Sequence, residues 1–266
     1  TSGRRAWCSS GWGIRSLRRS VEFVCWKMEA IRKLLIAVQG IAKHQDEIKR
    51  LKGEHFNIFS ILGMESAENK THSAFLGELL NPKGSHGMNG IFLEHFLRAI
   101  NSSEHLDLKT PVAVHLEFHI DWTDFDQVTG GRIDIYIQDG QKKSISIENK
   151  IYAGDQHQQV ARYVNHRTEH NKVYYLTLNG NDASKESRLE YEAGKHYHCI
   201  SYRDTITKWL ETCMKEAADQ PILRETIKQY LILIQKLTGQ LTEHKMAEAL
   251  YKAIGNNYEA AKLVTN

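Results

Sequence analysis

The sequence predicts an α/β fold in which helices flank a mixed four-stranded β-sheet and a helical C-terminal extension follows. Three observations indicate this fold. Apolar residues recur every three or four positions near both ends of the chain, as on one face of a helix. They alternate with polar residues in the middle of the chain, as on a half-buried strand. One helical run separates the third and fourth strand segments, which gives the order of an α/β core with a helical cap.

Helical segments are expected on both sides of the strand region. Met28–Leu51 carries a single apolar stripe. A second helix, Glu68–Leu80, should end at Asn81-Pro82-Lys83-Gly84, because proline cannot continue a helix and glycine relieves the turn. The other expected helices are Gly90–Ile100, Asp155–Val164, Thr205–Glu216, Ile222–Leu237 and Glu243–Lys252.

The strand segments occupy the middle of the chain. The expected strands are Val112–Ile120, Arg132–Gln138, Ser144–Lys150 and Val173–Leu178. Asp139-Gly140, between the second and third of these, is a turn signal. We therefore expect these two strands to form an antiparallel hairpin.

The chain should have four parts: a leader (1–27), an N-terminal helix (28–54), a core (55–200) and a helical C-terminal region (201–266). The leader holds three of the five tryptophans and six Lys or Arg against one acidic residue. Met28 opens a clean amphipathic pattern, so we interpret it as the biological start and the leader as non-native or disordered. A basic arm that contacts phosphates is the alternative. The last helical pattern has no clear stop signal, which is compatible with a truncated end.

The composition is that of a globular protein, with 41% hydrophobic and 25% charged residues. No apolar run is long enough to span a bilayer, so no membrane partner is expected. The leader carries most of the positive charge, and the modest basic balance does not by itself indicate a nucleic-acid partner. The cysteines have neither metal-ligand nor disulfide-framework spacing. This pattern favours a reducing compartment, the bacterial cytoplasm.

The predicted hairpin brings three ionisable side chains together. Side chains two apart on a strand project from the same face, so Glu148 and Lys150 point the same way, and the neighbouring strand offers Asp134. Two carboxylates in one pocket suit a hard cation such as Mg²⁺. Such a cation polarises a phosphoryl oxygen and lowers the pKa of bound water. Lys150 could orient that water or neutralise the phosphate.

Two further pairs add to these residues. Glu68 and His72 are four apart on a predicted helix and share a face, from which either could reach a metal. Gln159 and Tyr163 are also four apart, on the helix after Lys150, and could hold a phosphate or the attacking water. Each pair has a plainer interpretation, as a surface Glu–His pair and as a neutral hydrogen-bonding pair. A lone Glu-x-Lys on the polar face of a hairpin is usually only solvated.

Together these residues resemble a known group of proteins. Gly-Arg-Ile-Asp134-Ile and Ile-Glu148-Asn-Lys150-Ile are similar to the central signature of the PD-(D/E)XK nuclease superfamily. Ile133 stands where the superfamily name has proline. The resemblance implies a restriction-endonuclease-like core.

The flanking motifs narrow the resemblance. Gln159-x-x-x-Tyr163 resembles the RecB-like branch, in which an upstream histidine also serves the metal. Three segments are similar to a largely uncharacterised bacterial PD-(D/E)XK family: Asn57–Leu62, Glu68–Gly87 and Glu148–Gln156. The resemblance covers about residues 55 to 240.

The resemblance implies a Mg²⁺-dependent deoxyribonuclease, in which Mn²⁺ can substitute, acting on DNA in restriction, repair or defence against foreign DNA. The alternatives are a catalytically silent nucleic-acid-binding module and a helical interaction protein on the same fold. The expected metal ligands are Glu68, His72, Asp134 and Glu148, and the expected catalytic residues are Asp134, Glu148, Lys150, Gln159 and Tyr163.

Other side chains are candidates for supporting roles. Glu117 is a candidate carboxylate near the metal. Phosphate contacts could come from Lys70, Lys83, Arg132 and Arg162. The sequence makes no prediction of oligomeric state.

Overall fold

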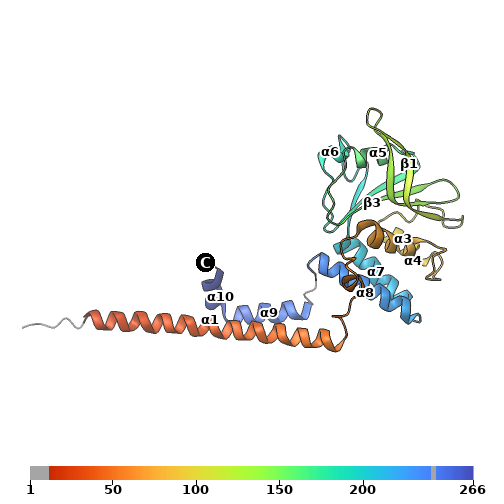
Figure 1. Ribbon diagram of the computed structural model, residues 1–266. Helices are drawn as coiled ribbons and strands as arrows, with labels where there is room; N and C mark the ends of the chain where they lie inside the picture. Colours follow the sequence, from red (N-terminus) through yellow and green to blue (C-terminus); the bar gives the residue numbers. More distant parts are fainter. Residues whose placement is uncertain (1–11, 241–243, 266) are drawn as a thin grey trace, which may run out of the picture. The chain divides into compact units, whose positions relative to one another are not determined.

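The computed structural model describes residues 12–240 and 244–265 (Figure 1). The chain divides into two compact units. Residues 1–55 and 242–266 form the first unit, and residues 56–241 form the second. Among the described residues, no helix combines the length and hydrophobicity that crossing a membrane requires.

The first unit is helical. α1 (Trp12–Leu51) contacts both α9 (His244–Asn256) and α10 (Tyr258–Thr265). α1 begins before Met28, where the helix was expected to start, because residues 12–27 continue the same helix. Residues 1–11 of the expected leader lie outside the described residues, as does Glu243, the expected start of the last helix. The interpretation of residues 1–27 as non-native stays a prediction.

The second unit contains a five-stranded sheet in the order β1-β2-β3-β4-β5. β1 (Ala113–Asp124), β2 (Thr129–Gln138) and β3 (Ser144–Lys150) are antiparallel neighbours. β4 (Asn171–Thr177) and β5 (His198–Ser201) continue the sheet in parallel with β3. The mixed sheet and the four expected strands are confirmed. The additional strand β5 has only four residues, too few for an alternating pattern to stand out.

Helices cover both faces of this sheet. The described helices of the second unit are α2 (Ile58–Ile61), η1 (Glu68–Ser73), α3 (Ala74–Leu80), α4 (Ile91–Ala99), α5 (Gln159–Asn165), α6 (Lys185–Arg188), η2 (Tyr202–Ile206), α7 (Thr207–Glu216) and α8 (Pro221–Leu237). Two of them, η1 and η2, are π-helices. The expected end of the helical segment before Asn81-Pro82 is confirmed.

The helix after β3 begins later than expected. α5 starts at Gln159 rather than Asp155, and Gln158 before it has a left-handed φ of 57° that a helix interior does not accept. The Asp155 carboxylate instead accepts hydrogen bonds from the Tyr175 hydroxyl and the Ser184 backbone N–H. These contacts hold the connection between β3 and α5 as a loop.

The sheet separates two hydrophobic clusters. On one face, Ile135, Ile145 and Ile147 pack with side chains of α3, α4, α7 and α8. On the other face, Tyr136 and Tyr175 pack with side chains of α5. Figure 1 shows the first set of helices on one side of the sheet and α5 and α6 on the other. α7 and α8 complete the first cluster and therefore belong to the same compact unit as the sheet.

Trp209 connects α7 to α4. Its ring is 1% exposed, its Nε1 donates to the Phe92 carbonyl at 2.8 Å, and its ring centroid lies 5.2 Å from that of Phe96. We predict that Trp209→Ala lowers the free energy of unfolding by about 3–5 kcal/mol, because it leaves a large cavity in the core. Urea denaturation followed by far-UV circular dichroism measures this change.

Trp122→Ala is the matched control. The Trp122 side chain is 85% exposed, so its removal should change the free energy of unfolding by about 0.5 kcal/mol or less. Equal losses in the two variants would contradict the assignment of Trp209 to the core.

Candidate active site

The site begins with the pairing of β2 and β3. Ile135 lies opposite Ile147, and continuing this register by one residue sets Asp134 opposite Glu148. Asp134 Oδ2 accepts a hydrogen bond of 2.8 Å from the backbone N–H of Asn149. The structure therefore brings the two carboxylates to adjacent positions on neighbouring strands.

A cavity of about 480 Å³ lies beside these strands. Trp122 and Arg132, from the hairpin of β1 and β2, form part of its wall. Neither His72 nor Tyr163 is among the residues that line it. Five of the seven residues expected for the site do line it: Glu68, Asp134, Glu148, Lys150 and Gln159.

Glu148 and Lys150 form a buried ion pair. Lys150 Nζ lies 2.7 Å from Glu148 Oε1, and both side chains are largely inaccessible to solvent. Burial, the largest single effect, lowers the pKa of Lys150, but the charge and hydrogen bond of Glu148 together with the charges of Asp134 and Glu68 leave the pKa above its ordinary value. Lys150 is therefore a fixed cation at the cavity.

The two carboxyl groups resist ionising together. Burial raises the pKa of Asp134 to about 6, although the Asn149 N–H lowers it. Burial and the nearby charge of Asp134 raise the pKa of Glu148 to about 8, against the opposing effect of Lys150. A second positive charge would relieve this repulsion.

One oxygen of the site is available to such a charge. Glu148 Oε2 is buried and has no hydrogen-bond partner. A buried, unpaired carboxylate oxygen is costly, and together with Asp134 it offers the oxygen donors that hard divalent cations prefer. The residues present therefore fit a Mg²⁺-type ion.

The protein supplies fewer ligands than expected. Within residues 12–240 and 244–265, no three His, Cys, Asp or Glu side chains group closely enough to hold a metal ion. The expected set of four side-chain ligands is not assembled. Mg²⁺ commonly keeps several water ligands and takes others from substrate phosphates, so two carboxylates are compatible with binding.

Glu68 lines the cavity, and its carboxylate also binds the backbone that follows β3. Its Oε1 accepts hydrogen bonds from the backbone N–H groups of Ile151, Tyr152 and Ala153, at 2.6, 2.9 and 2.9 Å. These three bonds hold the chain where it leaves β3. The negative charge of Glu68 also contributes to the raised pKa of Asp134, after burial.

His72 does not reach the cavity, contrary to its expected role as a metal ligand. It is fully buried, with Nδ1 2.9 Å from the Tyr230 hydroxyl and Nε2 2.9 Å from the Glu65 carbonyl oxygen. Both ring nitrogens are therefore engaged. The prediction assumed α-helical spacing, whereas η1 is a π-helix whose i→i+5 bonding changes the direction of successive side chains.

Gln159 and Tyr163 interact as their spacing predicts. Gln159 Nε2 donates to the Tyr163 hydroxyl at 3.3 Å, and that hydroxyl donates to the Arg132 carbonyl. Burial and the charge of Glu148 raise the pKa of Tyr163, so its hydroxyl stays protonated. Gln159 lines the cavity, and its amide is held by Tyr163 and by the backbone N–H of Gln156, which donates to its Oε1.

Asn149 is a site residue that the sequence reasoning missed. It lies between Glu148 and Lys150 and is fully buried. Its Nδ2 donates to Ser73 Oγ at 2.9 Å, and its Oδ1 accepts from the Tyr202 hydroxyl at 2.8 Å. Asn149 therefore anchors β3 to the helices on the other face. A polar residue inside a fully buried strand was the available signal.

Glu117 pairs with a cation rather than joining the two carboxylates. Its Oε2 lies 2.6 Å from Arg132 Nε. Its charge still acts on the site, since it raises the pKa of Asp134 after the larger effect of burial.

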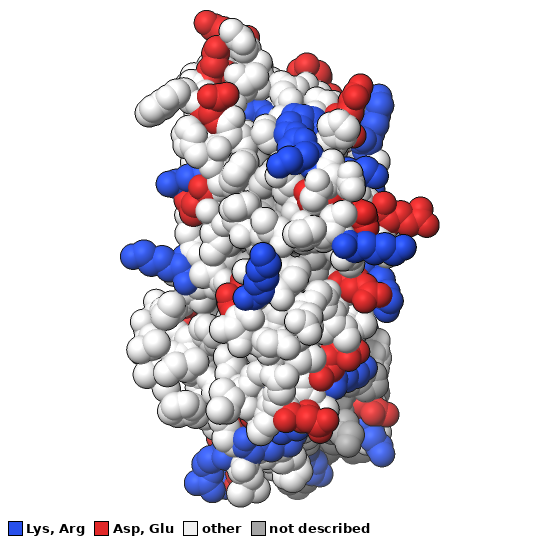
Figure 2. All heavy atoms as spheres, turned by 90° about the vertical axis from the view of Figure 1, so that its right-hand side faces the viewer, with Lys and Arg blue, Asp and Glu red and all other residues white. Residues whose placement is uncertain are grey.

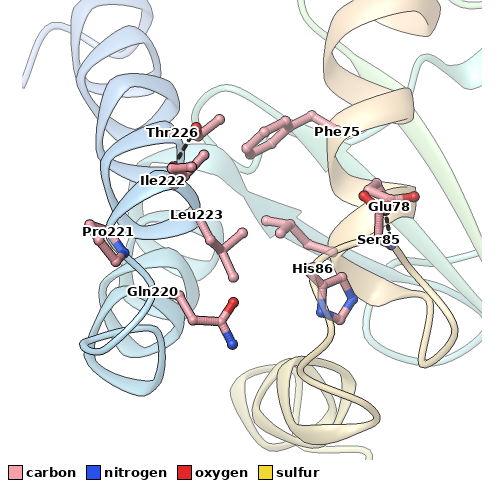
Figure 3. Close-up of a pocket in the computed structure, with 10 residues that line it drawn as sticks. Phe75, Glu78, Ser85, His86, Gln220, Pro221, Ile222, Leu223 and Thr226 are labelled. Atoms are coloured by element: carbon pink, nitrogen blue, oxygen red, sulfur yellow. Dashed lines mark hydrogen bonds between the residues drawn. The ribbon is translucent and has the colours of Figure 1, made fainter.

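A second cavity, of about 500 Å³, lies between α3, the loop at Ser85 and the start of α8. Figure 3 shows Phe75 on α3 and Thr226 on α8 on opposite sides of it. None of the residues expected for the site lines this cavity. The polar cavity beside β2 and β3 is therefore the candidate active site.

A family model described as the PD-(D/E)XK nuclease superfamily matches residues 56–232. The matched segment includes all five strands and every residue that lines the candidate site. No curated protein and no solved structure matches the chain.

The raised pKa values predict how stability depends on pH without metal. Between the ordinary pKa of glutamate, 4.5, and the folded pKa of Glu148, about 8, the folded state retains a proton that the unfolded chain has released. Stability is therefore lost as pH rises through this range. We predict that Glu148→Gln, which cannot ionise, becomes progressively more stable relative to the parent as pH rises. Urea denaturation in chelator across this range measures the difference.

Glu211→Gln, on the exposed surface of α7, is the control and should track the parent at every pH. A stability difference between Glu148→Gln and the parent that stays constant with pH would exclude a strained carboxyl at this position.

Proposed function

The chain belongs to the PD-(D/E)XK nuclease superfamily, and we propose that it hydrolyses phosphodiester bonds of DNA with a divalent metal ion, Mg²⁺ or in its place Mn²⁺. The observation that carries the proposal is that Asp134 and Glu148, which adjoin the paired residues Ile135 and Ile147 on adjacent strands, line one cavity with Lys150. We further propose that it acts in the bacterial cytoplasm, in restriction, repair or defence against foreign DNA.

Each residue of the site has a proposed part. Asp134 and the free oxygen of Glu148 would hold the cation, which when bound polarises the phosphate and lowers the pKa of water. Lys150 holds a positive charge where negative charge develops on the phosphate, or orients the attacking water. Gln159 offers an amide to a phosphate oxygen or to that water. Glu68 fixes the chain after β3 and adds negative charge.

Fewer residues support assignment to the RecB-like branch once their positions in the structure are known. Gln159 and Tyr163 keep the spacing of that branch and hydrogen-bond to one another. The upstream histidine, His72, does not line the cavity, and its two ring nitrogens bond to Tyr230 and Glu65. The branch assignment stays a prediction.

Binding of DNA phosphates would depend on the cationic side chains close to the candidate site. Figure 2 shows one face of the molecule, on which Lys and Arg side chains are interspersed with Asp and Glu. At the candidate site, Arg132 and Lys150 both line the cavity, and the Arg132 side chain is 62% exposed. Their position at the cavity supports the proposal that these two cations meet a DNA backbone beside the carboxylates.

We predict that Lys150→Ala lowers the rate of plasmid nicking and degradation at least about 100-fold, as expected for loss of a preorganised charge at a reacting phosphate. The fold should remain, which circular dichroism checks. Activity should appear with Mg²⁺ and Mn²⁺ and disappear with chelator.

Lys172→Ala is the matched control, because Lys172 is a half-buried lysine on the next strand that lines a different cavity. It should nick plasmid at the parental rate. Equal cleavage by Lys150→Ala and the parent would refute the role of Lys150. DNA binding without product in either metal would favour the silent binding module instead.

Metal binding can be tested without cleavage. A ligand that binds only the folded state stabilises it, by about 2.7 kcal/mol at 100 times its Kd. We predict that Mn²⁺ or Mg²⁺ raises the thermal midpoint of the parent at neutral pH, and that Asp134→Asn loses most of this rise. Asp219→Asn, at an exposed acidic position after α7, should keep it. The same rise in Asp134→Asn as in the parent would place the metal elsewhere.

A further inference from the structure

An exposed tryptophan forms part of the wall of the candidate site. Trp122 lies near the end of β1, and 85% of its side chain is accessible to solvent. It lines the same cavity as Asp134, Glu148 and Lys150. A single exposed aromatic residue is common on protein surfaces, but this one stands in the wall of a polar cavity, and ligand sites typically combine aromatic side chains with a few convergent polar groups.

The backbone holds Trp122 in a defined place. The β1–β2 register shifts between His119 and Asp121 and again between Asp121 and Asp124. At Gly130 on the facing strand, with φ +83°, a Cβ atom would lie 2.0 Å from the Trp122 carbonyl oxygen. Only glycine permits this close crossing. The distortion is therefore built into the sequence, and such bulges commonly re-aim side chains beside active sites.

Other exposed aromatic rings flank the catalytic strand. Phe125, three residues after Trp122, is 54% exposed, and the Arg162 guanidinium lies 5.7 Å from its ring centroid. Tyr152, two residues after Lys150, is 66% exposed, and Glu68 accepts a hydrogen bond from its backbone N–H. Aromatic side chains thus occur on the hairpin and on the loop that follows β3.

Aromatic rings next to cations bind nucleic acid in a specific way. Base–aromatic stacking tolerates every sequence, because each base has a flat face. In a duplex, that face is covered by neighbouring bases, whereas an unpaired strand exposes it. We propose that Trp122 stacks on a base of an unpaired DNA strand whose phosphate lies at Glu148 and Lys150. The substrate is then single-stranded DNA or an unpaired segment. This inference rests on the proposed nuclease function.

The test measures binding in the parental background with Ca²⁺ in place of Mg²⁺, another oxygen-liganded cation, so that the strand is held at an intact site without being cut. The probes are a labelled oligothymidylate of about 20 nucleotides, longer than one typical single-strand site, an abasic strand of equal length, and the matching blunt duplex. Fluorescence anisotropy gives each Kd. The variants compared with this background are Trp122→Ala and Trp122→Phe.

We expect the single strand to bind more tightly than the duplex. Trp122→Ala should weaken binding of oligothymidylate at least about fivefold, the lower end for one stacked base, and leave binding of the abasic strand unchanged. Trp122→Phe should retain most of the affinity. Ile222→Ala, which removes an 87% exposed side chain at the other cavity, should bind as the background does.

Three results would overturn the proposal. The first is an equal loss for the oligothymidylate and the abasic strand, and the second is duplex binding as tight as single-strand binding. A change in sedimentation with no change in base dependence would assign Trp122 to self-association instead, and overturn it too. Absence of any product from the parent with Mg²⁺ or Mn²⁺ would refute the nuclease function while leaving a base-dependent loss at Trp122 intact.

Discussion

The site depends on the register between β2 and β3. Side chains alternate faces along a strand, so a shift of one residue would move Glu148 and Lys150 to the opposite side of the sheet from Asp134. Two features oppose such a shift. β3 is buried along its whole length, with partners on both edges, and the Asn149 N–H bonds directly to the Asp134 carboxylate. The backbone therefore positions the acidic pair before any ligand binds.

Burial of these carboxyl groups in their ionised form costs the folded protein free energy. Glu148 is 1% exposed, and its raised pKa of about 8 shows that its ionised form is disfavoured by burial and by Asp134. Lys150 offsets only part of this cost, since Glu148 Oε2 remains without a partner. Strain of this kind persists only where the surroundings hold it in place. Here Asn149, bonded to Ser73 and Tyr202, attaches the strand to the helices behind it.

Local patterns predicted the parts of the structure that local forces determine. Alternation identified β2 and β3, and with them the juxtaposition of Asp134 and Glu148, because side-chain direction on a strand follows from spacing alone. The position of His72 outside the cavity could not be predicted from spacing, because the direction of its side chain depends on the π-helical turn of η1. Asn149 was missed because its partners, Ser73 and Tyr202, are distant in sequence. Long-range contacts of this kind leave no periodic signal.

The distortion of β1 connects the edge of the sheet to the site. β1 is an edge strand, and an exposed edge invites pairing with another chain unless bulges or charges prevent it. The register shifts around Asp121 interrupt its pairing surface. The same shifts, with the close crossing at Gly130, place Trp122 at the cavity that holds Glu148 and Lys150. One irregularity therefore interrupts the edge and also places an aromatic ring in the wall of the cavity, whereas β3 beside it stays regular.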